Sequence, residues 1–534
     1  MTDKPELQTH PDMFPLLRHF LALLPAAALL GLVSCQPIGP GSEKPGEGGL
    51  SSRPRTIITT DGEIDDVDSF IRMLLYANEF RIQGLVYSSS QWHYKGDGAG
   101  TPFVSEMAMT RNIYGERTEL RWPGTEWMQE LIAAYAEVYP NLRQHAMGYP
   151  EPDSLLSMVK VGNIDFEGEM DRDTEGSDHI RDALLDDDPS PLYLQVWGGT
   201  NTIARALKSI EDTYADSDQW EAVYRRVCGK AVIYAILDQD ATYRRYIAPR
   251  WPDLKTYYNS NQFWCFAYPW KRAVPHTWHA YLQGAFMRGE ILEDHGPLLE
   301  KYYAYGDGRK QEGDPEHLHG IALDSFNQSR QGQAWGPFDP YDFISEGDSP
   351  AYLHLIDVGL GNLEHPEYGG WGGRLVRSDS TPNRWEDGPR ASDYNPFRDS
   401  LDTTFPQTRW IPAIQEDFAG RADWCVLGYE QANHPPRVWV EGEAVRKVEP
   451  GQVVTLRGHA EDPDGDVVQY KWWVYREAGT YPVSPVLSGA DSQEVALTIP
   501  LNLESGQSIH LILEINDRAE HPMARYQRVI LKRD

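Results

Sequence analysis

Three aspartates, Asp61, Asp65 and Asp66, lie within one short segment, TTDGEIDDVDSF. Carboxylates held this close repel one another, and each negative charge raises the pKa of its neighbours unless a cation or protons separate them. Calcium accepts about six to eight oxygen ligands in a flexible geometry, whereas magnesium requires a tighter octahedron and keeps its waters. The segment therefore predicts a calcium site. A second interpretation stays open, in which Asp65 and Asp66 only stabilise a helix amino terminus.

The segments on either side predict how these aspartates are positioned. Residues 56–60 (TIITT) are all β-branched, which favours a buried strand, and apolar residues then repeat at helical spacing from Val67 to Ala77. A second short apolar run follows at residues 82–87. This β-α-β pattern predicts a parallel sheet, in which ligands bind beyond the carboxyl ends of the strands. Asp61 lies at such an end.

Such a site suits hydrolysis at the anomeric carbon of a sugar. That reaction passes through an oxocarbenium-like state and needs an activated water on one face of the ring and hydrogen bonds to its hydroxyls. Calcium would orient the water, and Asp61 would accept its proton. The sequence has no G-x-S-x-G, H-E-x-x-H or G-x-x-x-x-G-K-[ST] motif. The reaction classes that depend on those motifs are therefore excluded.

The composition sets wider limits on size and partners. With 534 residues, of which 40% are hydrophobic, the chain can bury a sizeable core and is expected to form more than one domain. The formal net charge is -31. Nucleic-acid binding depends on Lys and Arg at the phosphates, so this charge excludes a nucleic-acid partner.

The amino terminus predicts export and a lipid anchor. Residues 14–34 form an apolar segment that is too short and too interrupted by proline for a membrane span, and LVSC at its end resembles a bacterial lipobox. We therefore predict a signal peptide over residues 1–35, lipidation of Cys35 and a flexible linker over residues 36–54. The expected location is the cell envelope, as a secreted lipoprotein of the outer membrane, with this anchor as the only membrane contact. Translation from Met1 or from Met13 stays open.

The chain changes character near residue 433. From Val438 onward, short alternating runs separated by turns replace helical periods, which predicts an immunoglobulin-like β-sandwich over residues 433–534. Trp472 and Trp473 are adjacent, so in a strand they point to opposite faces. One is expected in the core, and the other is a candidate platform for a polysaccharide. The DPDGD turn at 462–466 is either a calcium site or an Asx-type turn.

Three cysteines remain besides Cys35: Cys228, Cys265 and Cys425. Their spacing matches no zinc motif. We expect free buried thiols or a single disulfide among them.

The segment that carries the three aspartates is similar to the D-x-D-x-G-x-D-D signature of the nucleoside hydrolase superfamily. It is still closer to a branch of cellulose-binding proteins with a nucleoside-hydrolase-like domain. Other segments resemble that branch in the same order along the chain: VGNID at 161–165, GSDHI at 176–180, VWGGTNTIARAL at 196–207, ILDQD at 236–240, EGDSPAYL at 346–353 and PEYGGWGGR at 366–374. The resemblance implies an α/β domain over residues 55–432, with an open, mostly parallel sheet and flanking helices.

The resemblance also implies roles for individual residues. Asp61 would be a calcium ligand and the general base, Asp65 would bond a sugar hydroxyl, and Asp66 would be a second calcium ligand. In GGTNTIA, ungapped matching makes the backbone carbonyl of Asn201 a further ligand, or that of Thr200 if the register shifts by one. The remaining candidates are Asp348 in GDSP as the last acidic ligand, and Asn163, Asp238 and Trp371 as substrate-binding residues. For Asp238 a solvated loop is an equally open interpretation, and for Trp371 so is packing over a loop-rich core.

The chain departs from the superfamily signature at three positions. Thr59 replaces its first aspartate and Glu63 replaces its glycine, although neither change removes a direct calcium ligand. Gly347 stands where the superfamily has a histidine that activates the leaving group, which argues against a nucleobase leaving group. The predicted function is calcium-dependent hydrolysis of a glycosyl bond, in an N-glycoside or related sugar compound. The alternative is a non-catalytic surface protein that binds cellulose or another carbohydrate.

Overall fold

The computed structural model describes residues 53–311 and 322–534. The predicted signal peptide, Cys35 and nearly all of the predicted linker lie outside the described residues. Within the described ranges, no helix has both the length and the apolar character needed to cross a membrane.

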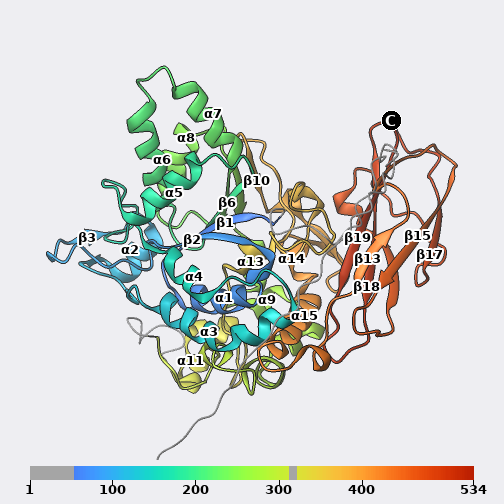
Figure 1. The fold of residues 1–534 in the computed structure, drawn as a ribbon, viewed down its shortest axis with the longest axis horizontal. Helices are drawn as coiled ribbons and strands as arrows, with labels where there is room; N and C mark the ends of the chain where they lie inside the picture. The colour runs from blue at the N-terminus through green and yellow to red at the C-terminus, as the bar shows by residue number, and fades with distance from the viewer. Residues whose placement is uncertain (1–52, 312–321) are drawn as a thin grey trace, which may run out of the picture. The chain divides into compact units, whose positions relative to one another are not determined.

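An eight-stranded sheet forms the centre of the amino-terminal part (Figure 1). Its order is β5-β2-β1-β6-β7-β8-β10-β9, and all neighbours are parallel except β10 and β9. The predicted mostly parallel sheet is therefore confirmed. The strands are β1 (Arg55–Thr60), β2 (Arg81–Tyr87), β5 (Val159–Val161), β6 (Leu192–Val196), β7 (Ala231–Ile236), β8 (Lys255–Asn259), β9 (Val376–Arg377) and β10 (Arg384–Glu386).

The direction of winding reverses between β1 and β6. From β1 the chain continues outward to β2 and then β5, whereas from β6 it continues in the opposite direction to β7 and β8. The two strands are direct neighbours, with Thr59 paired to Val196 near their carboxyl ends. In open α/β sheets, ligands bind in the crevice at such a reversal. The segment after β1, which starts with Asp61, lies at this point.

Helices cover both faces of the sheet because successive strand residues point to opposite sides. Ile57 packs in one core, with α5 (Glu175–Leu185), α6 (Asn201–Tyr214) and α7 (Trp220–Lys230). Ile58 packs in the other core, with α1 (Ile64–Leu75), α3 (Trp127–His145), α13 (Ser349–Leu353) and α15 (Ile411–Asp423). The remaining helices are α2 (Ala108–Tyr114), α4 (Pro152–Met158), α8 (Ala248–Arg250), α9 (Trp270–Ala273), α10 (Gly284–Phe286), α11 (Leu323–Gln328), α12 (Arg330–Trp335) and α14 (Phe405–Thr408).

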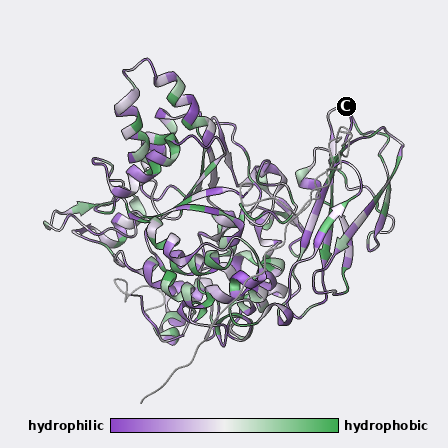
Figure 2. Cartoon of the chain, viewed as in Figure 1, coloured by the Kyte–Doolittle hydropathy of each residue, from purple (hydrophilic) through white to green (hydrophobic). Residues whose placement is uncertain are grey.

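The carboxyl-terminal strands form two sheets that enclose a separate core, which confirms the predicted β-sandwich. One sheet contains β13 (Arg437–Val440), β15 (Val453–Glu461) and β17 (Glu494–Thr498). The other contains β14 (Val445–Lys447), β19 (Arg525–Lys532), β18 (Ser508–Asn516) and β16 (Gln469–Val474). Hydrophilic and hydrophobic residues both occur along these strands (Figure 2), and exposed and buried residues alternate in β15. Trp472 is buried in the sandwich core and Trp473 lies on the opposite face.

The sandwich also contributes to the larger core of the α/β part. Ile512 and Met523 belong to that core, and the buried Arg528 guanidinium donates to the carbonyl oxygens of Leu360 at 2.6 Å and Tyr368 at 2.9 Å. The described residues of the α/β part and the sandwich accordingly belong to one compact unit. The sandwich and the α/β fold are distinct architectures that share a hydrophobic interior.

Cys228, Cys265 and Cys425 are free thiols, which leaves the first of the two predicted alternatives. Cys265 and Cys425 are buried, and Cys228 is half-buried. Burial raises the pKa of the Cys228 thiol to about 12.

Candidate metal and sugar site

The turn between β1 and α1 brings Asp61 to the reversal point of the sheet. Gly62 adopts a φ of +79°, a conformation that glycine tolerates without steric cost, and its N–H donates to the Thr60 hydroxyl at 3.2 Å. The end of β6 leaves room for the aspartate, because a Cβ at Gly198 would lie only 2.7 Å from Asp61 Cγ. Asp61 thus lies in the predicted crevice, and its side chain is 2% exposed.

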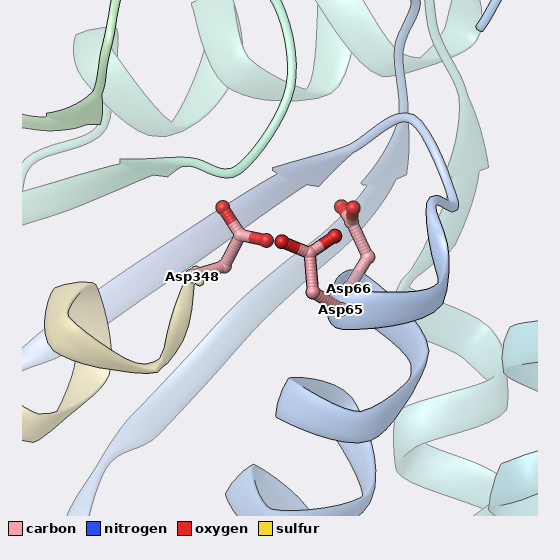
Figure 3. Close-up of side chains that lie close together, drawn as sticks. All are labelled: Asp65, Asp66 and Asp348. Atoms are coloured by element: carbon pink, nitrogen blue, oxygen red, sulfur yellow. The ribbon is translucent and has the colours of Figure 1, made fainter. Parts of the chain in front are cut away.

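Three carboxylates converge beside this turn (Figure 3). Asp65 and Asp66 lie in the first turn of α1, and Asp348 directly precedes α13. One oxygen from each lies within 4.8 Å of the others. Asp66 also accepts a hydrogen bond from the Thr60 hydroxyl. The structure therefore brings two of the predicted metal ligands, Asp66 and Asp348, together with Asp65, which was predicted to bond a sugar hydroxyl.

The electrostatics of this cluster favour a bound cation. Burial, followed by the charges of Glu63 and Asp61, raises the pKa of Asp65 well above its usual value. Burial and neighbouring carboxylates likewise raise the pKa of Asp66 and of Asp348. Asp61 Oδ2 is buried without a hydrogen-bond donor. A hard divalent cation would neutralise several of these charges at once, so the donor set fits calcium.

His93 contacts the same site and was missed from the sequence. Its buried ring places Nδ1 3.5 Å from Asp61 Oδ2 and 4.0 Å from Glu63 Oε2. The residue follows β2, so it comes from the same carboxyl edge of the sheet as Asp61. The sequence signal for His93 as a site residue was its position after a predicted strand. Its proximity to Asp61 could not be predicted, because it depends on the path of the loop.

Glu63, which replaces the glycine of the superfamily signature, is held by two other side chains. The Tyr268 hydroxyl donates to Glu63 Oε1 at 3.0 Å, and the Arg121 guanidinium lies 3.6 Å from the same oxygen. These contacts fix a carboxylate at the amino terminus of α1 that the superfamily signature lacks. Thr59, at the other departure, donates its hydroxyl to the Gln195 carbonyl at 3.2 Å and thereby joins β1 to β6.

Comparison with known proteins identifies the family. The profile described as "Cellulose-binding Sde182, nucleoside hydrolase-like domain" matches residues 55–375. The chain belongs to this family. The profile of the C-terminal domain of cellulose-binding protein Sde0182 matches residues 453–533, within the β-sandwich. No curated protein matches the chain.

A solved structure supports the same assignment. It is described as a nucleoside hydrolase-related hypothetical protein from Saccharophagus degradans that is associated with carbohydrate metabolism. The two chains are 25% identical, with a TM-score of 0.65 over 90% of this chain and 100% of the other. The nucleoside hydrolase-like fold and its carboxyl-terminal strand-rich region thus occur together in that structure as well.

Other predicted residues of the nucleoside hydrolase-like domain lie along the same sheet edge and are held by internal bonds. Asn201 is the first residue of α6, where its N–H donates to Asp240 at 2.8 Å and its amide to the Asn163 carbonyl at 2.8 Å. The Thr200 carbonyl accepts the first helical bond, from Ala204 at 2.9 Å. Burial and the charge of Asp238 raise the pKa of Asp240 to about 6. The structure thus joins Asn163 and Asn201 in one network beside the site.

The structure shows what surrounds Asp238 and Trp371, two of the predicted substrate-binding residues. Asp238 is buried and pairs through Oδ2 with Arg244 at 2.7 Å, so it is not a solvated loop residue, whereas its Oδ1 has no hydrogen-bond partner. Trp371 is 0% exposed and packs in the main core. The expectation that Trp371 offers a stacking face is therefore corrected: the aromatic residues in this glycine-rich loop fill the interior instead of lining a surface.

A cavity of about 1,080 Å³ borders the β1–α1 turn of the nucleoside hydrolase-like domain. Val67 and Gln311 line it, and the Gln311 amide donates to the Gly62 carbonyl at 2.6 Å. Trp122 and Trp127 also face it. The cavity is large enough for a small sugar compound, since ligand sites typically occupy about 300–1,000 Å³.

Proposed function

We propose that the nucleoside hydrolase-like domain hydrolyses a glycosyl bond, in an N-glycoside or a related sugar compound, with calcium held by Asp61, Asp66 and Asp348. The observation that carries this proposal is the convergence of Asp65, Asp66 and Asp348 beside Asp61, at the reversal point of the sheet. When bound, calcium would orient a water molecule and lower its pKa. We extend the proposed ligand set to the backbone carbonyl of Asn201, or of Thr200.

The side chains around the cluster have separate roles in the proposed reaction. Asp61 accepts the proton of the attacking water, and the His93 ring lies 3.5 Å from Asp61 Oδ2, on the side of the general base. Asp65 is the least buried of the three clustered aspartates and bonds a sugar hydroxyl. The burial of Asp61 and Asp66 excludes bulk water, which strengthens each of these electrostatic interactions.

A second candidate function is carbohydrate binding without catalysis. The descriptions of both matched domains name cellulose binding, which favours a polysaccharide partner. For either function we propose that the protein is an exported lipoprotein anchored through Cys35, as the lipobox-like LVSC segment suggests.

A hydrolysis screen with two variants tests the catalytic proposal. Nucleosides and small glycosides are incubated with the calcium-loaded protein, with Asp61→Asn and with Asp464→Asn as a control from a different acidic segment. We expect cleavage of at least one compound, and a loss of about 10²-fold or more in Asp61→Asn, because an amide accepts no proton from water. Full activity in Asp61→Asn would exclude it as the base. Calcium binding without cleavage of any compound would favour the binding function.

A further inference from the structure

A cleft of about 820 Å³ separates the β-sandwich from residues 394–416 of the α/β part. Eight aromatic side chains line it, together with carboxylates and amides. It shares no residue with the carboxylate cluster. Such a concentration of rings beside hydrogen-bonding groups is unusual for a surface without a ligand and typical of a binding site.

One wall of the cleft is the outer face of β16. Gln469, Lys471 and Trp473 alternate along this strand and line the cleft, whereas the intervening Trp472 points into the sandwich core. Trp473 is held firmly. Its Nε1 donates to Glu514 Oε2 at 3.0 Å, and the Arg409 guanidinium lies over the ring at 4.7 Å from its centroid.

The opposite wall comes from the hairpin of β11 (Asp393–Asn395) and β12 (Ser400–Asp402) and from the segment around Trp278. Tyr394 and Phe397 are 42% and 49% exposed. The Phe397 ring packs edge to face against Trp278, with centroids 4.7 Å apart and an interplanar angle of 72°. Aromatic rings from both walls therefore line the cleft. The exposure of Tyr394 and Phe397 is not explained by packing within the protein.

The charges of the lining favour a neutral ligand. Lys471 is paired with Glu514 at 3.2 Å, and Arg476 with Glu477 at 2.6 Å. Paired cations are poor partners for an anionic sugar, because each already has a carboxylate. The same carboxylates and the Gln469 amide can bond hydroxyl groups. A neutral pyranose matches both features, since its C–H faces pack on rings and its hydroxyls project from the edges.

A second, smaller hollow of about 330 Å³ is lined by residues that are sequence neighbours of cleft residues. Trp264 and Trp335 line it, as does Arg398, the neighbour of Phe397 in sequence. Trp335 stacks on Tyr268 at a centroid distance of 6.1 Å, and Tyr268 is the residue that donates to Glu63. Trp335 and Tyr268 thus link this hollow to Glu63 at the acidic site.

We propose that the cleft binds a single chain of a neutral β-linked glucan, with sugar rings packed on Phe397, Tyr394 and Trp473. The choice of cellulose as the glucan rests on the proposed carbohydrate-binding function, whereas the location of the site comes from the cleft itself. The glucan lies across the junction of the two folds.

Binding of cellohexaose to the whole protein, measured by calorimetry, tests the proposal. Phe397→Ala and Trp473→Ala are compared with wild type and with Trp439→Ala, a half-buried tryptophan that stacks on His459 outside the cleft. We expect each cleft variant to bind about tenfold more weakly and Trp439→Ala to bind within about twofold of wild type. Thermal melting of each variant verifies that it is folded. If Trp473→Ala is unstable, Phe397→Ala still tests the cleft, because Phe397 is exposed.

The possible outcomes separate this inference from the proposed functions. Equal binding by wild type and both cleft variants would overturn the cleft as the site while carbohydrate binding stands. Binding of neither cellohexaose nor insoluble cellulose by wild type would overturn both, and the hydrolysis screen would remain a separate test of the acidic site. Tighter binding of polygalacturonate than of cellohexaose would overturn the choice of a neutral chain.

Discussion

Gly347 lies against the carboxylate of Asp65: a Cβ at position 347 would be 2.6 Å from Asp65 Oδ2. The superfamily signature has a histidine at this position, and here a histidine would require Asp65 to move. The imidazole of this site comes instead from His93, on the side of Asp61. The absence of a side chain at Gly347 thus leaves room for the Asp65 carboxylate next to Asp348.

We predict that Gly347→Ala weakens calcium binding by about tenfold or more, because the added methyl group pushes the Asp65 carboxylate, which lies within 4.8 Å of the proposed ligands Asp66 and Asp348, out of its place. Calorimetric titration of the metal-free protein measures the change. Gly229→Ala, where a Cβ would meet nothing within 4 Å, is the control and should bind as wild type does. Unchanged affinity in Gly347→Ala would show that the placement of Asp65 does not affect the metal.

We predict one calcium ion per chain, bound at Asp66 and lost in Asp66→Ala. Saturating calcium should raise the melting temperature of wild type, since about 100-fold excess over Kd contributes about 2.7 kcal/mol. Binding should weaken as the pH falls, because protons compete for carboxyls whose pKa is raised.

The DPDGD turn provides the control for this metal prediction. Asp462 Oδ1 accepts the N–H groups of Asp464 and Asp466, both at 3.0 Å, as in an Asx-type turn. Asp466→Asn is therefore expected to retain the bound calcium. Loss of the ion in this variant, with retention in Asp66→Ala, would assign the metal to the sandwich instead.

We predict that the stability of wild type falls between about pH 4.5 and 7 through Glu167. Burial, followed by the charges of Asp240 and Glu106, raises its pKa from 4.5 to about 7. The folded state therefore holds this proton where the unfolded state has lost it, so the contribution is complete below pH 4.5 and lost as the pH rises through 7. Glu167→Gln should remove the share of this decline that comes from Glu167, about 3 kcal/mol, and leave the share that comes from the raised pKa of Asp240. Urea unfolding at several pH values measures it, and an unchanged pH profile in the variant would contradict the assignment.

We predict that Arg528→Met destabilises the protein by about 3 kcal/mol or more. The change leaves the carbonyls of Leu360 and Tyr368 buried without their donor, at the contact between the two folds. Chemical unfolding gives the free energy, with the exposed Arg457→Met as control. A variant as stable as wild type would show that the hydrophobic contacts alone join the sandwich to the α/β part.

The sequence by itself determined the local elements and their faces. β-branched residues followed by a helical period predict β1, α1 and β2, because each element buries one side of a regular repeat. The same regular spacing predicts that Asp61 lies at a strand end and that Trp472 and Trp473 lie on opposite faces of β16. These features depend only on neighbouring residues, so they can be read without the fold. Asp348 was also predicted as a site residue, but that prediction came from resemblance to a known family and not from a local pattern.

Tertiary structure alone decided which distant residues meet. The approach of His93 to Asp61, the contact between Gly347 and Asp65 and the burial of Trp371 depend on loop paths between strands. The cleft at Phe397 depends likewise on how the sandwich packs against the α/β part. No local repeat encodes these contacts, because strand order and loop packing are set by the summed burial of many side chains, each contributing about 1.5–3 kcal/mol or less. The chemistry of the chain is therefore visible in its sequence, whereas the arrangement of that chemistry exists only in the folded protein.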